Sequence, residues 1–138
     1  MSDLEATRLE LHGDLSELRR LAEWINARAP HVISTDTLFA VQLSLEEAVA
    51  NIIMHGGAGD LAIAIELERN GATLVARIED TGCEFDPTQF PPLSMAKSVE
   101  DAKVGDYGIH LMRCFASDMH YERQEGRNRL TLRFAASH

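Results

Sequence analysis

The sequence has few of the residues that cross-link small domains or bind metals in clusters. Only two cysteines occur among 138 residues, Cys83 and Cys114, and they show neither CxxC spacing nor a repeated metal pattern. This pattern excludes a disulfide framework and predicts two free thiols in a reducing cytosol. No second histidine lies at a zinc-like spacing from His55, so a zinc site is excluded as well.

Long apolar runs are also missing. No stretch of about 18 apolar residues occurs, so no membrane-spanning helix is predicted. The first residues, Met1 to Glu5, are acidic and lack the apolar core of a signal peptide. We therefore expect a cytoplasmic protein with no membrane partner.

Basic residues are outnumbered. Lysine and arginine together number 13 against 22 acidic residues, which gives a net charge of −9, and the only lysines are Lys97 and Lys103. Nucleic acid and anionic membranes would repel such a chain, so neither is expected as a partner. Basic proteins and metal complexes of small anions fit this charge better.

The remaining composition is typical of a folded protein. Hydrophobic residues make up 45% and charged residues 25%, which argues against disorder. The length is near the commonest domain size, and we find no internal repeat or linker. We therefore expect a single domain over residues 1–138.

Periodicity predicts five strands and three helices. Alternating patterns predict strands at 7–11, 61–68, 73–78, 119–123 and 128–134. Three- and four-residue spacing predicts helices over 14–29, 38–55 and 105–115, with a long loop over 85–104. Asp14, with Glu17 three residues on, predicts a capping box for the first helix. Turns are expected at Asn70-Gly71 and Glu125-Gly126. This order predicts an α+β fold with helices on one face of a mostly antiparallel sheet, and not a βαβ repeat.

Three polar residues interrupt the second predicted helix. Glu47 and Asn51 are four residues apart and share a face, which His55 continues. A carboxylate and an amide oxygen so placed could hold Mg²⁺, or the carboxylate could accept a proton from a hydroxyl. The same residues would also suit an ordinary solvated helix face.

A second polar group follows the third predicted strand. Asp80 at a strand end can accept a hydrogen bond from an exocyclic amine such as that of adenine. Gly82 would let the backbone of this turn approach a flat ligand. Phe85 follows three residues later. A plain turn would give the same pattern.

Two glycines, Gly105 and Gly108, open the last predicted helix. Glycines at a helix start expose backbone N–H groups that suit a phosphate. Taken alone, this spacing is as typical of a helix cap.

The order of these motifs resembles a known family. The strings SLEEAVANIIMHG, IEDTGCEFDP, VGDYGIHLM and NRLTLRF are similar to the ATP-binding boxes of the GHKL superfamily. Within it, the chain most resembles the anti-sigma-factor serine kinases, from about Leu9 to Phe134. The resemblance implies a two-layer α/β sandwich, the Bergerat fold, which agrees with the predicted element order.

The resemblance also implies a role for each matching residue. Glu47 would be the general base, Asn51 would coordinate Mg²⁺ and Asp80 would bind the adenine amine. The nucleotide pocket would further include the following residues: His55, Gly82, Phe85, Lys97, Lys103, Gly105, Gly108 and Thr131. Of these, Gly105 and Gly108 would face the phosphates at the hinge of an ATP lid over about 87–104. Thr131 would hold the adenine end, although a solvent-facing strand threonine is an equal alternative.

The implied reaction is transfer of the γ-phosphoryl group of Mg-ATP to a serine of an anti-sigma-factor antagonist, a STAS-type protein. The implied second partner is a sigma factor, and relatives are commonly homodimers. Two features depart from the family pattern. Asp106 stands where a second glycine is usual, and the lid has lysines but no arginine. A lysine is a point charge without the fork of arginine.

Two other functions remain open. Asp106 and the arginine-free lid favour a binding module that holds its partner without phosphoryl transfer, whereas Glu47 favours the enzyme. The ATPase domain of a two-component histidine kinase is less favoured, because no dimerisation helix with a phosphoacceptor histidine is found in the sequence.

Overall fold

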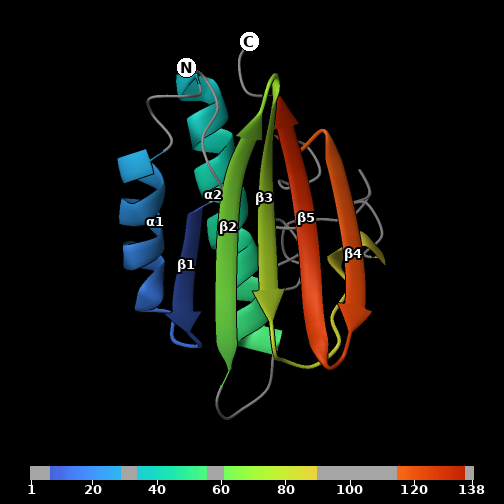
Figure 1. Cartoon of the computed structure of the whole chain (residues 1–138). Coiled ribbons are helices and arrows are strands. Elements are labelled where there is room, and N and C mark those ends of the chain that lie inside the picture. The colour runs from blue at the N-terminus through green and yellow to red at the C-terminus, as the bar shows by residue number, and fades with distance from the viewer. Residues whose placement is uncertain (1–6, 29–33, 56–60, 90–114, 136–138) are drawn as a thin grey trace, which may run out of the picture.

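The computed structural model describes residues 7–28, 34–55, 61–89 and 115–135. These residues form an antiparallel sheet with two long helices, drawn in Figure 1. The sheet order is β1-β2-β3-β5-β4. The elements are β1 (Thr7–His12), α1 (Glu17–Arg28), α2 (Thr35–His55), β2 (Ala62–Asn70), β3 (Thr73–Asp80), the short 3₁₀ helix η1 (Pro87–Gln89), β4 (Asp118–Gln124) and β5 (Arg127–Ala135).

Both helices cover one face of the sheet (Figure 1). Side chains alternate along each strand, and the inward set forms one core with the apolar residues of α1 and α2. Fully buried members include Leu21 and Leu45 from the helices and Ile65, Ile78 and Leu132 from the strands. The expected α+β architecture, with helices on one face, is therefore confirmed.

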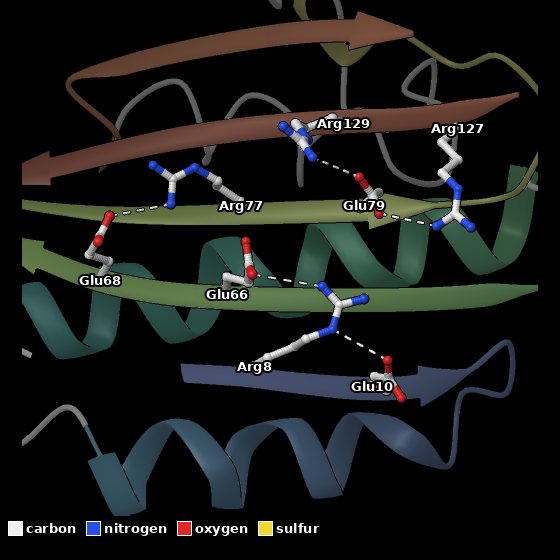
Figure 2. Close-up of polar contacts among 8 residues, drawn as sticks. All are labelled: Arg8, Glu10, Glu66, Glu68, Arg77, Glu79, Arg127 and Arg129. Carbon is white, nitrogen blue, oxygen red and sulfur yellow. Dashed lines mark hydrogen bonds and ion pairs between the residues drawn. The ribbon is translucent and has the colours of Figure 1, made fainter. Parts of the chain in front are cut away.

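The opposite face of the sheet carries paired charges (Figure 2). Glu79 lies between two arginines, with Arg129 at 3.0 Å and Arg127 at 3.2 Å. Partial burial raises the pKa of Glu79, but these two arginines outweigh it and hold the pKa below its usual value. Two further groups complete the pairing: Arg8 with Glu10 and Glu66, and Arg77 with Glu68. The arginines and glutamates of these groups are equal in number, so their charges balance.

Local hydrogen bonds fix the helix starts. Ser34 caps α2, since its hydroxyl accepts the backbone N–H of Thr37 at 3.2 Å. At α1 the predicted capping box takes another form. The Glu17 carboxylate accepts the N–H of His12 and not that of Asp14, while Asp14 accepts the N–H of Ser16. The chain turns tightly enough here for Glu17 to reach two residues further back.

Two-residue turns set the register of the hairpins. Asn70 pairs with Thr73, so the β2–β3 turn consists of Gly71, with φ 59°, and Ala72. This is one residue later than the predicted Asn70-Gly71 turn. The β4–β5 turn is Glu125-Gly126 as expected. Both residues have positive φ, 55° and 77°, which is typical of a type I′ turn.

Helix α2 is long and apolar enough to pass a length-and-composition test for a membrane helix, with a mean hydropathy of 1.3. Core helices of folded proteins pass the same test, so it is weak evidence. Val41, Leu45 and Val49 of α2 are fully buried in the core against the sheet. Within the described residues, α2 therefore serves as the central core helix.

Part of the predicted secondary structure falls outside the described residues. Of the predicted helix 105–115 only Phe115 is described, and it is helical. Of the predicted lid, Pro87–Gln89 forms η1 and residues 90–104 lie outside the described ranges.

Candidate functional site

The candidate site lies where β3 ends and β5 begins. Asp80 is directly opposite Asn128, and Asn128 is directly opposite Arg123 of β4. Asp80 comes two residues after Ile78, and Asn128 two residues before Leu130. Ile78 and Leu130 both point into the core. Strand alternation therefore turns the Asp80 and Asn128 side chains toward the helix layer, where both are buried.

Asp80 is a buried carboxylate held in one orientation. It is 4% exposed, and its Oδ1 accepts the N–H of Gly82 at 2.8 Å and Nδ2 of Asn128 at 2.9 Å. Burial raises the pKa of Asp80 above its ordinary value, and the bonds from Asn128 and Gly82 offset this only in part. Within the described residues both of these hydrogen bonds end on Oδ1, so Oδ2 remains for a ligand donor.

Asn128 connects Asp80 to the edge strand β4. Its Nδ2 also donates to the carbonyl of Cys83 at 2.8 Å. Its Oδ1 accepts the Tyr121 hydroxyl and, at 2.9 Å, Nη1 of Arg123. The same Arg123 nitrogen donates to the carbonyl of Gly82 at 3.1 Å. The turn after β3 is therefore held by side chains of β5 and of the edge strand β4.

A small cavity adjoins Asp80. Its volume is about 20 Å³, and its lining is Ala48, Asn51, Ile52, Asp80, Phe85, Pro87, Tyr121, Asn128 and Leu130. That volume suits about one water molecule, far below the roughly 300 Å³ at which ligand pockets begin. The cavity is therefore too small for a nucleobase in this conformation.

Asn51 supplies an unmet polar group to this cavity. It is 3% exposed, and its Nδ2 has no hydrogen-bond partner among the residues that the structure describes. Buried polar groups are nearly always paired, so an unpaired one calls for an explanation. A bound polar ligand would supply the partner. An amide oxygen is also a ligand type that Mg²⁺ accepts, so the residues present fit Mg-ATP in kind.

Phe85 lines the cavity and contacts the end of α2. Its ring stacks on the ring of His55, with centroids 4.7 Å apart and planes 8° from parallel. His55 itself is exposed and does not line the cavity. Among the described residues, His55 is therefore connected to the site through Phe85.

The structure brings together part of the predicted site. Asn51, Asp80 and Phe85 line the cavity, and Gly82 binds the Asp80 carboxylate through its N–H. Glu47 is half-buried on α2, one turn before Asn51, and is not among the cavity residues. Four predicted residues lie outside the described residues and remain predictions: Lys97, Lys103, Gly105 and Gly108.

The prediction for Thr131 is wrong in this structure. Thr131 lies opposite Arg77 and His120, on the face away from the core, because Leu130 and Leu132 on either side of it point inward. An inward position near Asp80 belongs to Asn128. The sequence does contain a signal for Asn128: the inward residues Leu130, Leu132 and Phe134 alternate along β5, and the same alternation puts Asn128 on the inner face.

Comparison with known proteins identifies the fold and the family. The chain matches the family described as the Histidine kinase-like ATPase domain over residues 9–134. This chain belongs to that family.

Relatives of this ATPase domain include an enzyme. The domain is 35% identical over 96 residues to the Serine/threonine-protein kinase BtrW of Bordetella bronchiseptica. The matched region covers 68% of each chain. Its structure is similar to that of the Acinetobacter baumannii histidine kinase AdeS, with a TM-score of 0.52 and 15% identity, over 93% of this chain and 68% of that one. This second likeness shows the fold alone.

The expected resemblance to GHKL serine kinases is thus confirmed. Membership of an ATPase family implies ATP binding. Asp80 and Asn51, the two buried polar residues expected in the pocket, lie at one cavity of this ATPase domain.

Proposed function

We propose that this chain is an ATP-dependent protein serine kinase and anti-sigma factor of a bacterial partner-switching system. Its substrate would be a serine on a STAS-type anti-sigma-factor antagonist in the cytoplasm, and its second partner a sigma factor. The proposal rests on one cavity that joins the buried Asp80 carboxylate to Asn51, whose Nδ2 has no partner among the described residues. The chain also belongs to an ATPase family and has a serine/threonine kinase among its relatives.

Asp80 would select the base. A buried acceptor held by Gly82 and Asn128 complements an exocyclic amine and opposes a carbonyl at the same place. A site built for a hydrogen bond strongly rejects an analogue that lacks the donor. Adenine is therefore favoured over bases with an oxygen at this position.

Two α2 residues would serve the phosphate end. Asn51 would hold Mg²⁺, which neutralises charge on the phosphates when bound. Glu47 would accept the proton of the substrate serine hydroxyl. Their spacing of four residues keeps both on one side of the helix.

Charge supports release of the product. Phosphorylation adds about −1.5 to −2 to the antagonist, and this chain already carries −9. Repulsion between them would weaken the phosphorylated complex. A loss of antagonist binding would free the chain to hold its second partner.

A non-catalytic binding module is the second candidate. The cavity of about 20 Å³ at Asp80 favours it, since a cavity of this volume is too small for a base. Such a module would hold its partner, with or without ATP, and would transfer no phosphoryl group.

Calorimetry of ATP binding separates these candidates. We expect Mg²⁺ to strengthen ATP binding by the wild-type chain, and Asn51→Ala to reduce that gain about tenfold or more, as for loss of a charge-assisted contact. No binding at millimolar ATP would leave the module as the function.

Glu47→Ala tests the phosphoryl transfer itself. It should bind ATP like the wild type and fail to phosphorylate the antagonist, because the proposed base is gone. Glu46→Ala is the matched control, one residue away on the same helix. Equal phosphorylation by Glu47→Ala and wild type would remove Glu47 from the mechanism.

A further inference from the structure

We infer that Asn128 is a positioning residue for base selection, which acts through Asp80 and is itself held by Tyr121 and Arg123. The inference rests on the proposed nucleotide site and deepens it. The ligand class would be purine nucleotides with an amine at C6, and the selectivity against an oxygen at C6 would depend on Asn128.

The partners of Asn128 fix its amide in one orientation. Nδ2 faces two acceptors, Oδ1 of Asp80 and the carbonyl of Cys83. Oδ1 faces the Tyr121 hydroxyl and the Arg123 guanidinium. Arginine can only donate hydrogen bonds, so a flipped amide would place donor against donor at Arg123 and acceptor against acceptor at Asp80.

Asn128 thereby leaves one Asp80 oxygen for a ligand. Oδ1 is bonded by Gly82 and Asn128, so a base amine would meet Oδ2. Without Asn128, the buried carboxylate would lose one of two fixed bonds and could turn Oδ1 or Oδ2 toward other donors. The bond to the C6 amine would weaken, whereas a C6 oxygen gains nothing from Asp80 in either case.

Tyr121 connects Asn128 to Phe85, another residue that lines the cavity. Its hydroxyl bonds Asn128 and also makes a hydrogen bond with the backbone of Phe85. Phe85 and Tyr121 both line the cavity. The edge strand β4 thus holds Asn128, which positions the acceptor for the base, and also bonds Phe85 at the same cavity.

The experiment compares ATP with ITP, which carries an oxygen in place of the C6 amine. Dissociation constants of both are measured by calorimetry with Mg²⁺ for wild type, Asn128→Ala and Tyr121→Phe. In Asn128→Ala we expect ATP affinity to fall about tenfold or more and ITP affinity to change little, so that the preference for ATP falls by about the same factor. Tyr121→Phe should shift the preference in the same direction by less, because Arg123 still holds Asn128.

Two controls separate positioning from general damage. Asn70→Ala removes an exposed asparagine at the far end of the sheet, whose amide bonds Glu68 at 3.4 Å, and should leave both affinities unchanged. In an Asp80→Asn background, Asn128→Ala should cause no further loss of preference, because its route to the base is already broken.

The outcomes distinguish this inference from the proposed function. Wild-type chain that binds neither nucleotide would overturn both. Wild-type ATP binding with an equal loss of ATP and ITP affinity in Asn128→Ala, or with no loss, would overturn the role of Asn128 alone. If Asn128→Ala does not fold, Tyr121→Phe decides: an unchanged preference for ATP would refute the inference.

Discussion

The proposed role of Asp80 in base binding comes with a cost in stability. Burial raises its pKa, so the native chain holds the proton more tightly than the unfolded chain does. The ionised carboxylate therefore lowers stability at pH values above the raised pKa, and this penalty disappears as the pH falls through it. Residues that bind ligands through buried charge commonly show this conflict.

Asp80→Asn should raise the melting temperature near pH 7 while it weakens ATP binding. An asparagine keeps one oxygen for the bonds from Gly82 and Asn128 and carries no buried charge. Thermal unfolding without nucleotide, followed by circular dichroism, should show a gain that shrinks as the pH falls toward about 4, the ordinary range of aspartate.

Asp14→Asn is the matched control for this experiment. Hydrogen bonds from Ser16 lower the pKa of Asp14, which is fully exposed at the start of α1. Its charge costs nothing in the folded chain, so the same chemical change should give no gain in melting temperature near pH 7. A gain of equal size in both variants would contradict the explanation from burial.

Sequence patterns predicted Asp80 and Asn51 as site residues, but they did not predict Asn128, which bonds Asp80 from the neighbouring strand. Asp80 could be predicted because its motif stands in the order of the family's ATP-binding boxes, although a plain turn would give the same local pattern. Asn128 lies 48 residues away, and its role depends on the register of β3 against β5. A sequence motif cannot predict that register, although the alternation around Leu130 does indicate that Asn128 faces the core side of the sheet.

The hairpin between β4 and β5 has a local conflict between sequence and geometry. Glu125 has φ 55° and Gly126 has φ 77°. Glycine accepts this conformation freely, whereas glutamate does not. Asparagine before glycine is the preferred pair for such a turn.

Glu125→Asn should therefore stabilise the chain by about 0.5–1 kcal/mol, the usual gain when a residue suits its backbone conformation. Chemical denaturation at neutral pH would measure it as a higher midpoint with an unchanged slope. Glu122→Asn, on the extended part of β4, is the control and should bring no gain. Destabilisation by Glu125→Asn would mean that the glutamate side chain makes a stabilising contact.

Element order could be predicted well, since the apolar spacing of α2 and the alternation of the five strands are strong and consistent signals. Details that depend on three dimensions were less accessible. The carboxylate of Glu17 bonds His12 and not the predicted cap residue. The β2–β3 turn lies one residue later than its Asn-Gly signal, because the pairing of Leu67 with Ala76 and Ile65 with Ile78 in the core fixes the register.

The two layers share one core, which makes the described fold a cooperative unit. Leu45 and Trp24 bring α2 and α1 into the same cluster as the inner side chains of the sheet. Loss of packing at α2 should therefore be felt in every element. Trp24 is the only tryptophan, so its fluorescence reports on α1 while circular dichroism reports on all of the secondary structure.

Leu45→Ala should destabilise the chain by about 2–5 kcal/mol, because Leu45 is fully buried and leaves a cavity. Phe39→Ala, on the same helix but 63% exposed, should change stability by less than about 1 kcal/mol. Urea unfolding followed by fluorescence and by circular dichroism should give coincident transitions in both variants, as a single core requires. Separate transitions would mean that α1 and the sheet unfold independently, and an effect of Phe39→Ala as large as that of Leu45→Ala would mean that the outer side of α2 is covered in the folded protein.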